Sequence, residues 1–300
     1  MSDSAAPFTK QSRSLQVVAV LAATSTLAAI IWSSSLPLWL GMRVYSEQVL
    51  LVVLAASMAI TVLTRPRLRA GAGAGPDRVD QGLALVALIW GVVMVVRFPV
   101  LSQNVFYHPT EALILSLVGM TLLLESVRRA MGWALIVILG LVVLYALFSS
   151  YLSGPMQSRS IKWDRLITFM VLDSASLAGA ALYIAVAVVV PFLILAQLLL
   201  QTGGSAFLAD LSMAVAGRKR GGAGKIAILG SALFGSVSGS AVSNVASTGA
   251  ITIPLMKDGG YRPKTAAAIE ASASTGGQLM PPIMGASAFL LAENLQVAYG

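Results

Sequence analysis

Residues 235–254 read GSVSGSAVSNVASTGAITIP, and this segment most constrains what the chain can fold into. It is apolar enough to lie in a membrane, yet its middle consists of glycine, serine and asparagine. Lys225 precedes it and Lys257 follows it, and basic residues mark the cytoplasmic side of a membrane protein. The sequence therefore predicts a re-entrant helical hairpin, residues 226–256, that enters the bilayer, turns and returns to the cytoplasmic side.

The polar middle of this hairpin indicates a binding site. Irregular backbone persists at membrane depth only where protein buries it or where it lines a cavity, and transporters place ligand sites at broken helices. A break near Ser238 and Gly239 frees carbonyl groups for a cation, and a new helix start near Ser240 points N–H groups at an anion. Close packing through Gly235 and Gly239 is the alternative interpretation. Packing does not require the polar side chains of Ser236, Ser238, Ser240, Ser243, Asn244, Ser247 and Thr248.

A second interruption, GGQLMPP, occupies residues 276–282. Pro281 and Pro282 each remove a backbone donor, and Gly276 and Gly277 let the chain unwind just before them. A simple proline kink is the alternative. We expect this break to meet the hairpin tip in the middle of the membrane.

Composition places the whole chain in a lipid bilayer. Hydrophobic residues make up 57% and charged residues 11% of it, whereas soluble domains carry about 25% charged residues. The sequence predicts an all-α polytopic membrane protein with about seven transmembrane helices, one re-entrant helical hairpin and one discontinuous helix. The net charge of +8 resides in short loops between apolar segments, so it reflects membrane topology and does not indicate a nucleic-acid partner.

The charged residues in the loops also predict on which side of the membrane each loop lies. Most Lys and Arg residues fall on the cytoplasmic side when the amino terminus is cytoplasmic. Residues 1–14 are then a cytoplasmic tail, and residues 15–129 are a membrane domain of four helices. The fourth of these, around residues 111–127, is short, and whether it crosses completely is open. Glu125, Arg128 and Arg129 at its end have the spacing of helical ion pairs.

No motif indicates an enzyme. The GGAGK sequence at residues 221–225 lacks the spacing of a phosphate-binding loop. His108 is the chain's one histidine, and it has no partner for a metal site or a catalytic triad. Glu270 is either functional or an interfacial carboxylate near Lys264, and both readings stay open. We expect no resident cofactor.

Residues 230–293 resemble the signature region of the large membrane subunit of TRAP transporters. The resemblance rests on SGSAVSN, on the IPLMKDGGYRP turn and on STGGQLMPP, and the basic AGRKRGGAGK stretch also fits. It is closest to the fused permeases that work with TAXI-type substrate-binding proteins. Residues 15–129 then correspond to the small subunit, and residues 130–300 to the first part of a large subunit that continues in the family beyond this chain.

The resemblance implies a function and partners. It implies a permease of the bacterial inner membrane that imports small organic acids, driven by a sodium gradient, with Na⁺ as the coupling ion. A periplasmic TAXI-type binding protein would deliver the substrate. A non-transporting membrane scaffold or assembly subunit is the alternative, and an intramembrane enzyme is a third possibility.

The residues and the resemblance together give a candidate site. Two helix starts, after Gly239 and after Pro282, are expected to face an anionic substrate. The substrate- and ion-binding candidates are Ser236, Ser238, Gly239, Ser240, Asn244, Thr248, Ser274, Thr275, Gly276, Gly277, Gln278, Pro281 and Pro282. The sodium ligands among them are predicted to be Ser238, Ser240, Asn244 and Thr275.

Overall fold

Helices form all the regular structure in the part of the chain that the computed structural model describes. These residues are 6–42, 44–66, 76–104, 109–173, 175–218, 220–281 and 284–297. His108 and Pro282 lie outside them. The chain divides into two compact units, residues 1–186 and residues 187–300.

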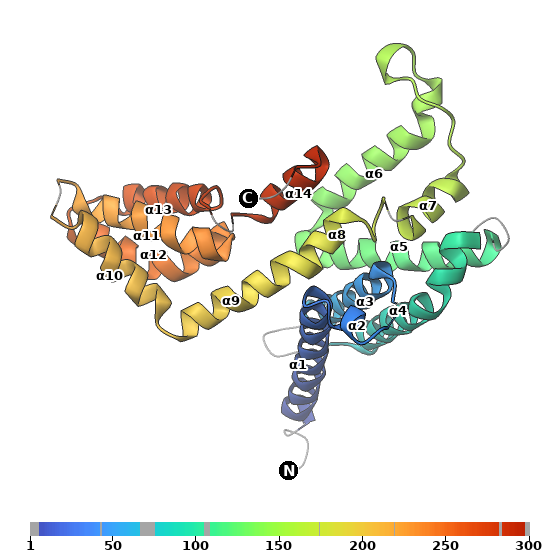
Figure 1. Cartoon of the computed structure of the whole chain (residues 1–300), viewed down its shortest axis with the longest axis horizontal. Helices are drawn as coiled ribbons and strands as arrows, with labels where there is room; N and C mark the ends of the chain where they lie inside the picture. Colours follow the sequence, from blue (N-terminus) through green and yellow to red (C-terminus); the bar gives the residue numbers. More distant parts are fainter. Residues whose placement is uncertain are drawn as a thin grey trace. The chain divides into compact units, whose positions relative to one another are not determined.

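The helices follow one another along the chain as Figure 1 labels them. The first unit holds α1 (Ala6–Ser33), α2 (Leu36–Trp39), α3 (Ser46–Thr64), α4 (Arg78–Asn104), α5 (Pro109–Met131), α6 (Trp133–Phe148), η1 (Ser149–Tyr151), η2 (Gly154–Met156), α7 (Trp163–Leu172) and α8 (Ala180–Ile184). The short η3 (Ala185–Val189) contains the boundary. The second unit holds α9 (Val190–Gln201), α10 (Gly204–Ala216), α11 (Gly222–Ser238), α12 (Ala241–Asp258), α13 (Pro263–Gly277) and α14 (Ala286–Leu295).

Six helical segments among the described residues are long and apolar enough to cross a membrane. They are Leu15–Ser33, Ser46–Thr64, Arg78–Gln103, Thr110–Met131, Trp133–Tyr151 and Ala180–Leu199. Ala206–Ala216 and Gly222–Ser238 are shorter apolar helices. These findings confirm the predicted all-α polytopic membrane fold. The fourth segment, which the sequence left in doubt, has 22 residues and is long enough to cross.

The division into compact units falls at a different place from the predicted domain boundary between residues 129 and 130. The predicted boundary concerned which residues correspond to a small and a large subunit. Compactness does not measure that correspondence, so the domain assignment stays a prediction.

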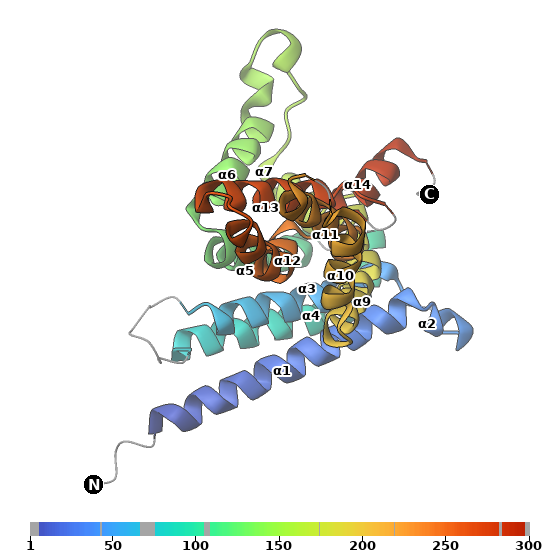
Figure 2. The ribbon, with the colours of Figure 1, turned by 90° about the vertical axis from the view of Figure 1, so that its left-hand side faces the viewer.

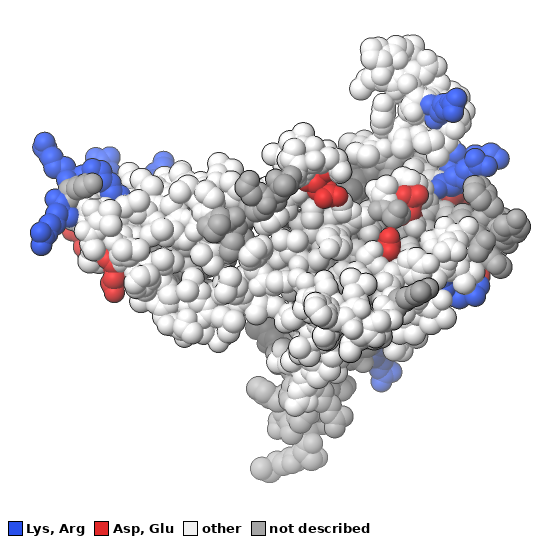
Figure 3. Space-filling model, viewed as in Figure 1, with Lys and Arg blue, Asp and Glu red and all other residues white. Residues whose placement is uncertain are grey.

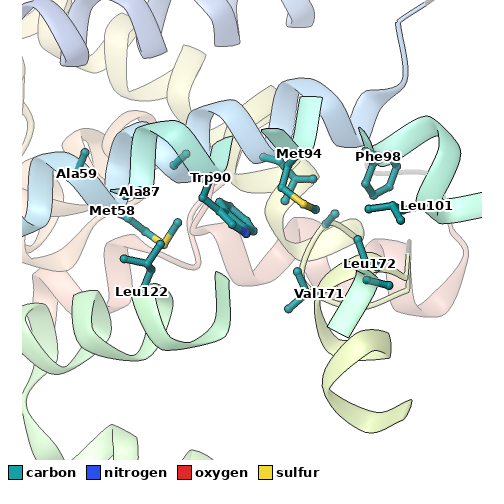
Figure 4. Packing of buried hydrophobic residues seen from close by; sticks show 14 of the residues in the cluster. Met58, Ala59, Ala87, Trp90, Met94, Phe98, Leu101, Leu122, Val171 and Leu172 are labelled. Carbon is teal, nitrogen blue, oxygen red and sulfur yellow. The ribbon is translucent and has the colours of Figure 1, made fainter. Parts of the chain in front are cut away.

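In the first unit, α3, α4 and α5 pack around a buried apolar cluster that includes Trp90 and Phe98 (Figure 4). Trp90 is 3% exposed, and its Nε1 donates a hydrogen bond to the Leu115 carbonyl oxygen over 2.9 Å. A Cβ on Gly119 would lie 2.4 Å from the Trp90 ring, and a Cβ on Gly91 would lie 2.5 Å from the Ala55 Cβ. Glycines thus let these helices approach closely, as is usual between membrane helices.

A buried ion cluster joins the helix ends of the same unit. Arg129 on α5 is paired with Asp80 on α4 over 2.7 Å and with Glu125 over 2.8 Å. The side chains of Arg129 and Asp80 are 2% and 1% exposed. Arg129 also donates to the carbonyl oxygens of Val62 and Arg65 at the end of α3, at 3.3 Å each. The predicted ion pairs of Glu125 with Arg128 and Arg129 are therefore present. The Arg129 side chain also binds groups at the ends of α3 and α4.

Replacement of Arg129 by alanine is expected to destabilise the first unit by about 3–5 kcal/mol, because it leaves the buried Asp80 carboxylate without its partner. Thermal unfolding of the purified protein in detergent measures the loss. The matched control is Arg97→Ala, which breaks the more exposed pair between Arg97 and Glu111. It should cost much less, and equal losses for the two variants would show that the Arg129 cluster does not stabilise the unit.

Candidate functional site

The predicted hairpin is formed by α11 and α12, which pack against each other, and α13 packs against both (Figure 1, Figure 2). The break between α11 and α12 comes at Gly239, whose φ of +60° is a left-handed conformation that favours glycine. Ser240 then caps α12, and its side-chain oxygen accepts a hydrogen bond from the Ser243 N–H over 3.3 Å. The turn therefore lies where the sequence predicts it.

Both ends of the hairpin lie at the same end of the second unit. Figure 3 shows Lys and Arg side chains gathered at the left of the view, over the connections from α10 to α11 and from α12 to α13. The Tyr261 hydroxyl donates to the Gly221 carbonyl oxygen over 3.4 Å and so joins these two connections. The structure contains the hairpin, and its return to the same side of a membrane stays a prediction.

The hairpin tip meets the second interruption of the chain. Helix α13 ends at Gly277, α14 begins at Ala286, and the described residues between them, 278–281, 284 and 285, are not helical. The Gln278 Nε2 donates to the Gly239 carbonyl oxygen over 3.4 Å, and a Cβ on Gly239 would lie 2.3 Å from the Met284 carbonyl oxygen. The discontinuous helix and its contact with the tip are thus as predicted, although their depth in a membrane is not tested.

A second close approach lies deeper in the hairpin. A Cβ on Gly235 would be 2.5 Å from the Gly277 Cα, and a Cβ on Gly277 would be 2.7 Å from the Ser231 carbonyl oxygen. Gly277 also lies beside Asn244, since its Cβ would be 2.9 Å from the Asn244 Nδ2. The α11–α13 crossing therefore needs glycine on both helices.

The four predicted sodium ligands occupy three different environments. Ser238 and Ser240 lie together at the tip, where the Ser240 N–H donates a hydrogen bond to the Ser238 Oγ over 3.5 Å. Asn244 is fully buried, and its Nδ2 donates to the Ser231 carbonyl oxygen over 2.7 Å. Thr275 is exposed, and its hydroxyl donates to Ala271 of its own helix over 2.8 Å. Of the four predicted sodium ligands, only Ser238 and Ser240 lie next to each other.

The other candidate residues also separate. The Ser236 hydroxyl donates to Leu233 within its own helix over 2.8 Å. Pro281 and Gly276 are exposed. Thr248 and Ser274 are buried and meet at the carboxyl group of Glu270, to which their hydroxyls donate over 2.6 Å and 3.2 Å. The Thr248 hydroxyl also lies 3.0 Å from the Asn244 Oδ1, so Thr248 and Asn244 lie together.

Glu270 is the residue whose place the sequence left open. It is fully buried and forms no ion pair with Lys264, and its depth in a membrane stays a prediction. Its Oε2 accepts a hydrogen bond from the Thr252 hydroxyl over 2.5 Å, and its Oε1 accepts one from the Ser231 hydroxyl over 2.9 Å. One signal was available in the sequence: Glu270 and Ser274, like Thr248 and Thr252, are four residues apart and so share a helix face. The partnership with Ser231 had no local signal.

Comparison with known proteins gives the class of the chain. Residues 118–300 match the family model described as "Tripartite ATP-independent periplasmic transporter, DctM component". The chain therefore belongs to this family of multi-pass membrane permeases, whose members are transporters and not enzymes.

The similar relatives carry more specific names. The chain is 32% identical over 110 residues to the 2,3-diketo-L-gulonate TRAP transporter large permease protein YiaN of Escherichia coli, which is 36% of this chain and 26% of the relative. It is 39% identical over 94 residues to the C4-dicarboxylate TRAP transporter large permease protein DctM of Pseudomonas aeruginosa, 31% of this chain and 22% of the relative. It is 32% identical over 110 residues to the sialic acid TRAP transporter permease protein SiaT of Haemophilus influenzae, 36% of this chain and 18% of the relative.

These matches cover only part of each protein. The chain spans 22% to 26% of the length of the first curated relatives that it matches. No solved structure matches it.

Replacement of Gly235 by alanine is expected to disrupt the α11–α13 crossing, because the new Cβ would collide with the backbone of Gly277. Overpacking of this kind costs about 1–3 kcal/mol. Gly230→Ala on the same helix is the matched control, since its Cβ would meet only the Ser212 Oγ at 3.6 Å. Proteolysis of the purified protein should be faster for Gly235→Ala and unchanged for Gly230→Ala; equal resistance would contradict the crossing.

Single cysteines at Lys225 and Lys257 are expected to react with a membrane-impermeant thiol reagent from the same side, because the hairpin returns to its starting side. The chain contains no cysteine of its own, so each label reports one position. Cysteines at Thr110 and Met131, which bound α5, are the control and should react from opposite sides. Labelling of residues 225 and 257 from opposite sides would replace the re-entrant hairpin with a single crossing.

Proposed function

We propose that this chain is part of the permease of a sodium-driven transporter that imports small organic acids with the help of a periplasmic substrate-binding protein. The observation that carries the proposal is the contact between the broken tip of α11–α12 and the non-helical segment that follows α13. Two helix breaks that meet in an apolar protein are the arrangement in which transporters bind ions and substrates. Membership of the tripartite periplasmic transporter family supports the same function.

The tip offers oxygen atoms and no charged groups. No Lys, Arg, Asp or Glu lies between Lys225 and Lys257. The Gly239 carbonyl oxygen and the hydroxyls of Ser238 and Ser240 lie at the turn. Hard cations prefer oxygen ligands, so we propose that Na⁺ binds here, with Asn244 holding the neighbouring backbone of α11 in place. In this proposal Thr275 binds Na⁺ only in a state in which its hydroxyl no longer donates to the Ala271 carbonyl oxygen of its own helix.

The same turn offers positive helix ends to an anion. Helix α12 begins at Ala241, after its Ser240 cap, and a helix amino terminus carries about half a positive charge. Helix α14 begins at Ala286, after the second break. No Lys or Arg occurs after Lys264. A carboxylate bound here would therefore depend on these helix ends, on the bound cation, or on a basic residue elsewhere in the transporter.

The names of the relatives fit a carboxylate substrate, since C4-dicarboxylates, diketogulonate and sialic acid are all organic acids. We further propose that the binding protein is of the TAXI type and that residues 15–129 act as a fused small subunit. In this proposal the permease lies in the bacterial inner membrane with a cytoplasmic amino terminus.

Uptake by the complete permease and its binding protein in proteoliposomes tests the proposal. An inward sodium gradient should drive uptake of a small carboxylic acid and should not drive uptake of its neutral amide. Asn244→Ala should raise the sodium concentration for half-maximal uptake about tenfold, since loss of a buried hydrogen-bonding group costs about 1–3 kcal/mol.

Thr121→Ala is the control for this variant, because the Thr121 hydroxyl bonds only to carbonyl oxygens of its own helix in the first unit. Equal uptake of the acid and the amide would rule out carboxylate recognition. An unchanged sodium dependence in Asn244→Ala would remove Asn244 from the cation site.

A further inference from the structure

Glu270 joins three helices through one carboxyl group. Its Oε1 accepts hydrogen bonds from Ser231 on α11 and from Thr248 on α12, over 2.9 Å and 2.6 Å. Its Oε2 accepts one from Thr252 on α12, over 2.5 Å, and Ser274 of its own helix lies 3.2 Å from Oε1. Glu270, Ser231 and Ser274 are fully buried, Thr252 is 2% exposed and Thr248 is 7% exposed.

No basic side chain balances this carboxyl group in the described residues. The charged residues of the helices packed around it are Asp210 on α10, Lys225 on α11, Lys257 and Asp258 on α12 and Lys264 on α13. All five are exposed, and none of them forms an ion pair with Glu270. A buried carboxylate without a neighbouring cation is costly. The four hydroxyls can compensate the charge, and a bound proton can remove it.

The Thr252 hydroxyl can serve both charge states. Its oxygen lies 2.5 Å from Glu270 Oε2 and 3.0 Å from the Thr248 carbonyl oxygen, and a hydroxyl has only one hydrogen to donate. When the carboxyl group is ionised, this hydrogen points at Oε2. When Oε2 carries a proton, the carboxyl O–H donates to the Thr252 oxygen and the Thr252 hydroxyl donates to the Thr248 carbonyl oxygen. Every donor then has an acceptor in either state, without movement of a heavy atom.

The short distances leave no space for a metal ion between these hydroxyls and the carboxyl group. Separations of 2.5 Å and 2.6 Å between hydroxyl and carboxyl oxygens are those of strong O–H···O hydrogen bonds. Oxygens this close leave room for one hydrogen between them. A sodium ion would have to push the hydroxyls of Thr248 and Thr252 away from the carboxyl group.

We propose that Glu270 is a proton-binding site: Oε2 takes a proton from water and later returns it, so that the carboxyl charge changes between −1 and 0 while the Thr252 hydroxyl turns between its two acceptors. None of the four hydroxyl partners of Glu270 is a predicted sodium ligand. The site adjoins Asn244, since the Thr248 hydroxyl lies 3.0 Å from the Asn244 Oδ1 and the Asn244 Nδ2 donates to the Ser231 carbonyl oxygen over 2.7 Å. Its proton binding does not require that the proposed transport function be correct.

Infrared difference spectra of the purified full chain in lipid vesicles, recorded between acidic and alkaline pH without substrate or binding protein, test the proposal. Beside the carbonyl bands of its exposed carboxylic acids, the protein should show at low pH a separate band from the buried Glu270 and should lose that band at high pH. Glu270→Gln should abolish this band. Glu293→Gln, which changes an exposed glutamate on α14, is the matched control and should keep it.

A second variant covers the case in which Glu270→Gln does not fold. Thr252→Val removes the acceptor of the carboxyl proton and should shift the band. The proposal is overturned if the band is absent at every pH, if it persists at every pH, or if neither variant changes it. Loss of the band on addition of Na⁺ at constant pH would show that the site binds sodium instead. Since no transport is measured, these outcomes are independent of the uptake experiment.

Discussion

The contact between Gly235 on α11 and Gly277 on α13 is the constraint on which the second unit depends. The two backbones approach so closely that a Cβ on Gly235 would lie 2.5 Å from Gly277. Polar backbone groups at membrane depth have to be satisfied inside the protein, and this approach brings the partners within reach. Gln278 meets the Gly239 carbonyl oxygen just beyond the crossing, and Asn244 meets the Ser231 carbonyl oxygen just before it. The hairpin tip and the break after α13 are thus consequences of one helix crossing.

Most of this architecture could be predicted from the sequence, because glycine and proline act on the backbone where they stand. Gly239 supplies a left-handed conformation at the predicted turn, and α13 ends at Gly277 within the predicted interruption. The hairpin predicted over residues 226–256 is formed by helices that extend slightly further, from Gly222 to Asp258. Apolar length likewise predicted the membrane segments, since a crossing helix needs about 20 residues.

Which residues of each helix point into the protein could not be predicted in the same way. Neighbouring residues on a helix point about 100° apart, so a small error in helix rotation exchanges a buried residue for an exposed one. Thr275 was predicted as a sodium ligand, yet it is exposed, while the adjacent Ser274 is buried against Glu270. The Ser231 hydroxyl donates to Glu270 from 39 residues away, and no local pattern encodes that distance. Predicting it requires the helix packing first.

The two units satisfy their buried polar groups by different means, and the difference has a mechanical consequence. In the first unit, Arg129 holds Asp80 and Glu125 through charged pairs at the helix ends, and such a cluster has one favourable arrangement. In the second unit, hydroxyls surround a single carboxyl group, and the Thr248 and Thr252 hydroxyls each have a carbonyl oxygen as a second acceptor. Charged pairs fix the relative positions of α3, α4 and α5. Under the proposed proton binding, rotation of the Thr252 hydroxyl would let α11, α12 and α13 keep their packing when the charge of Glu270 changes.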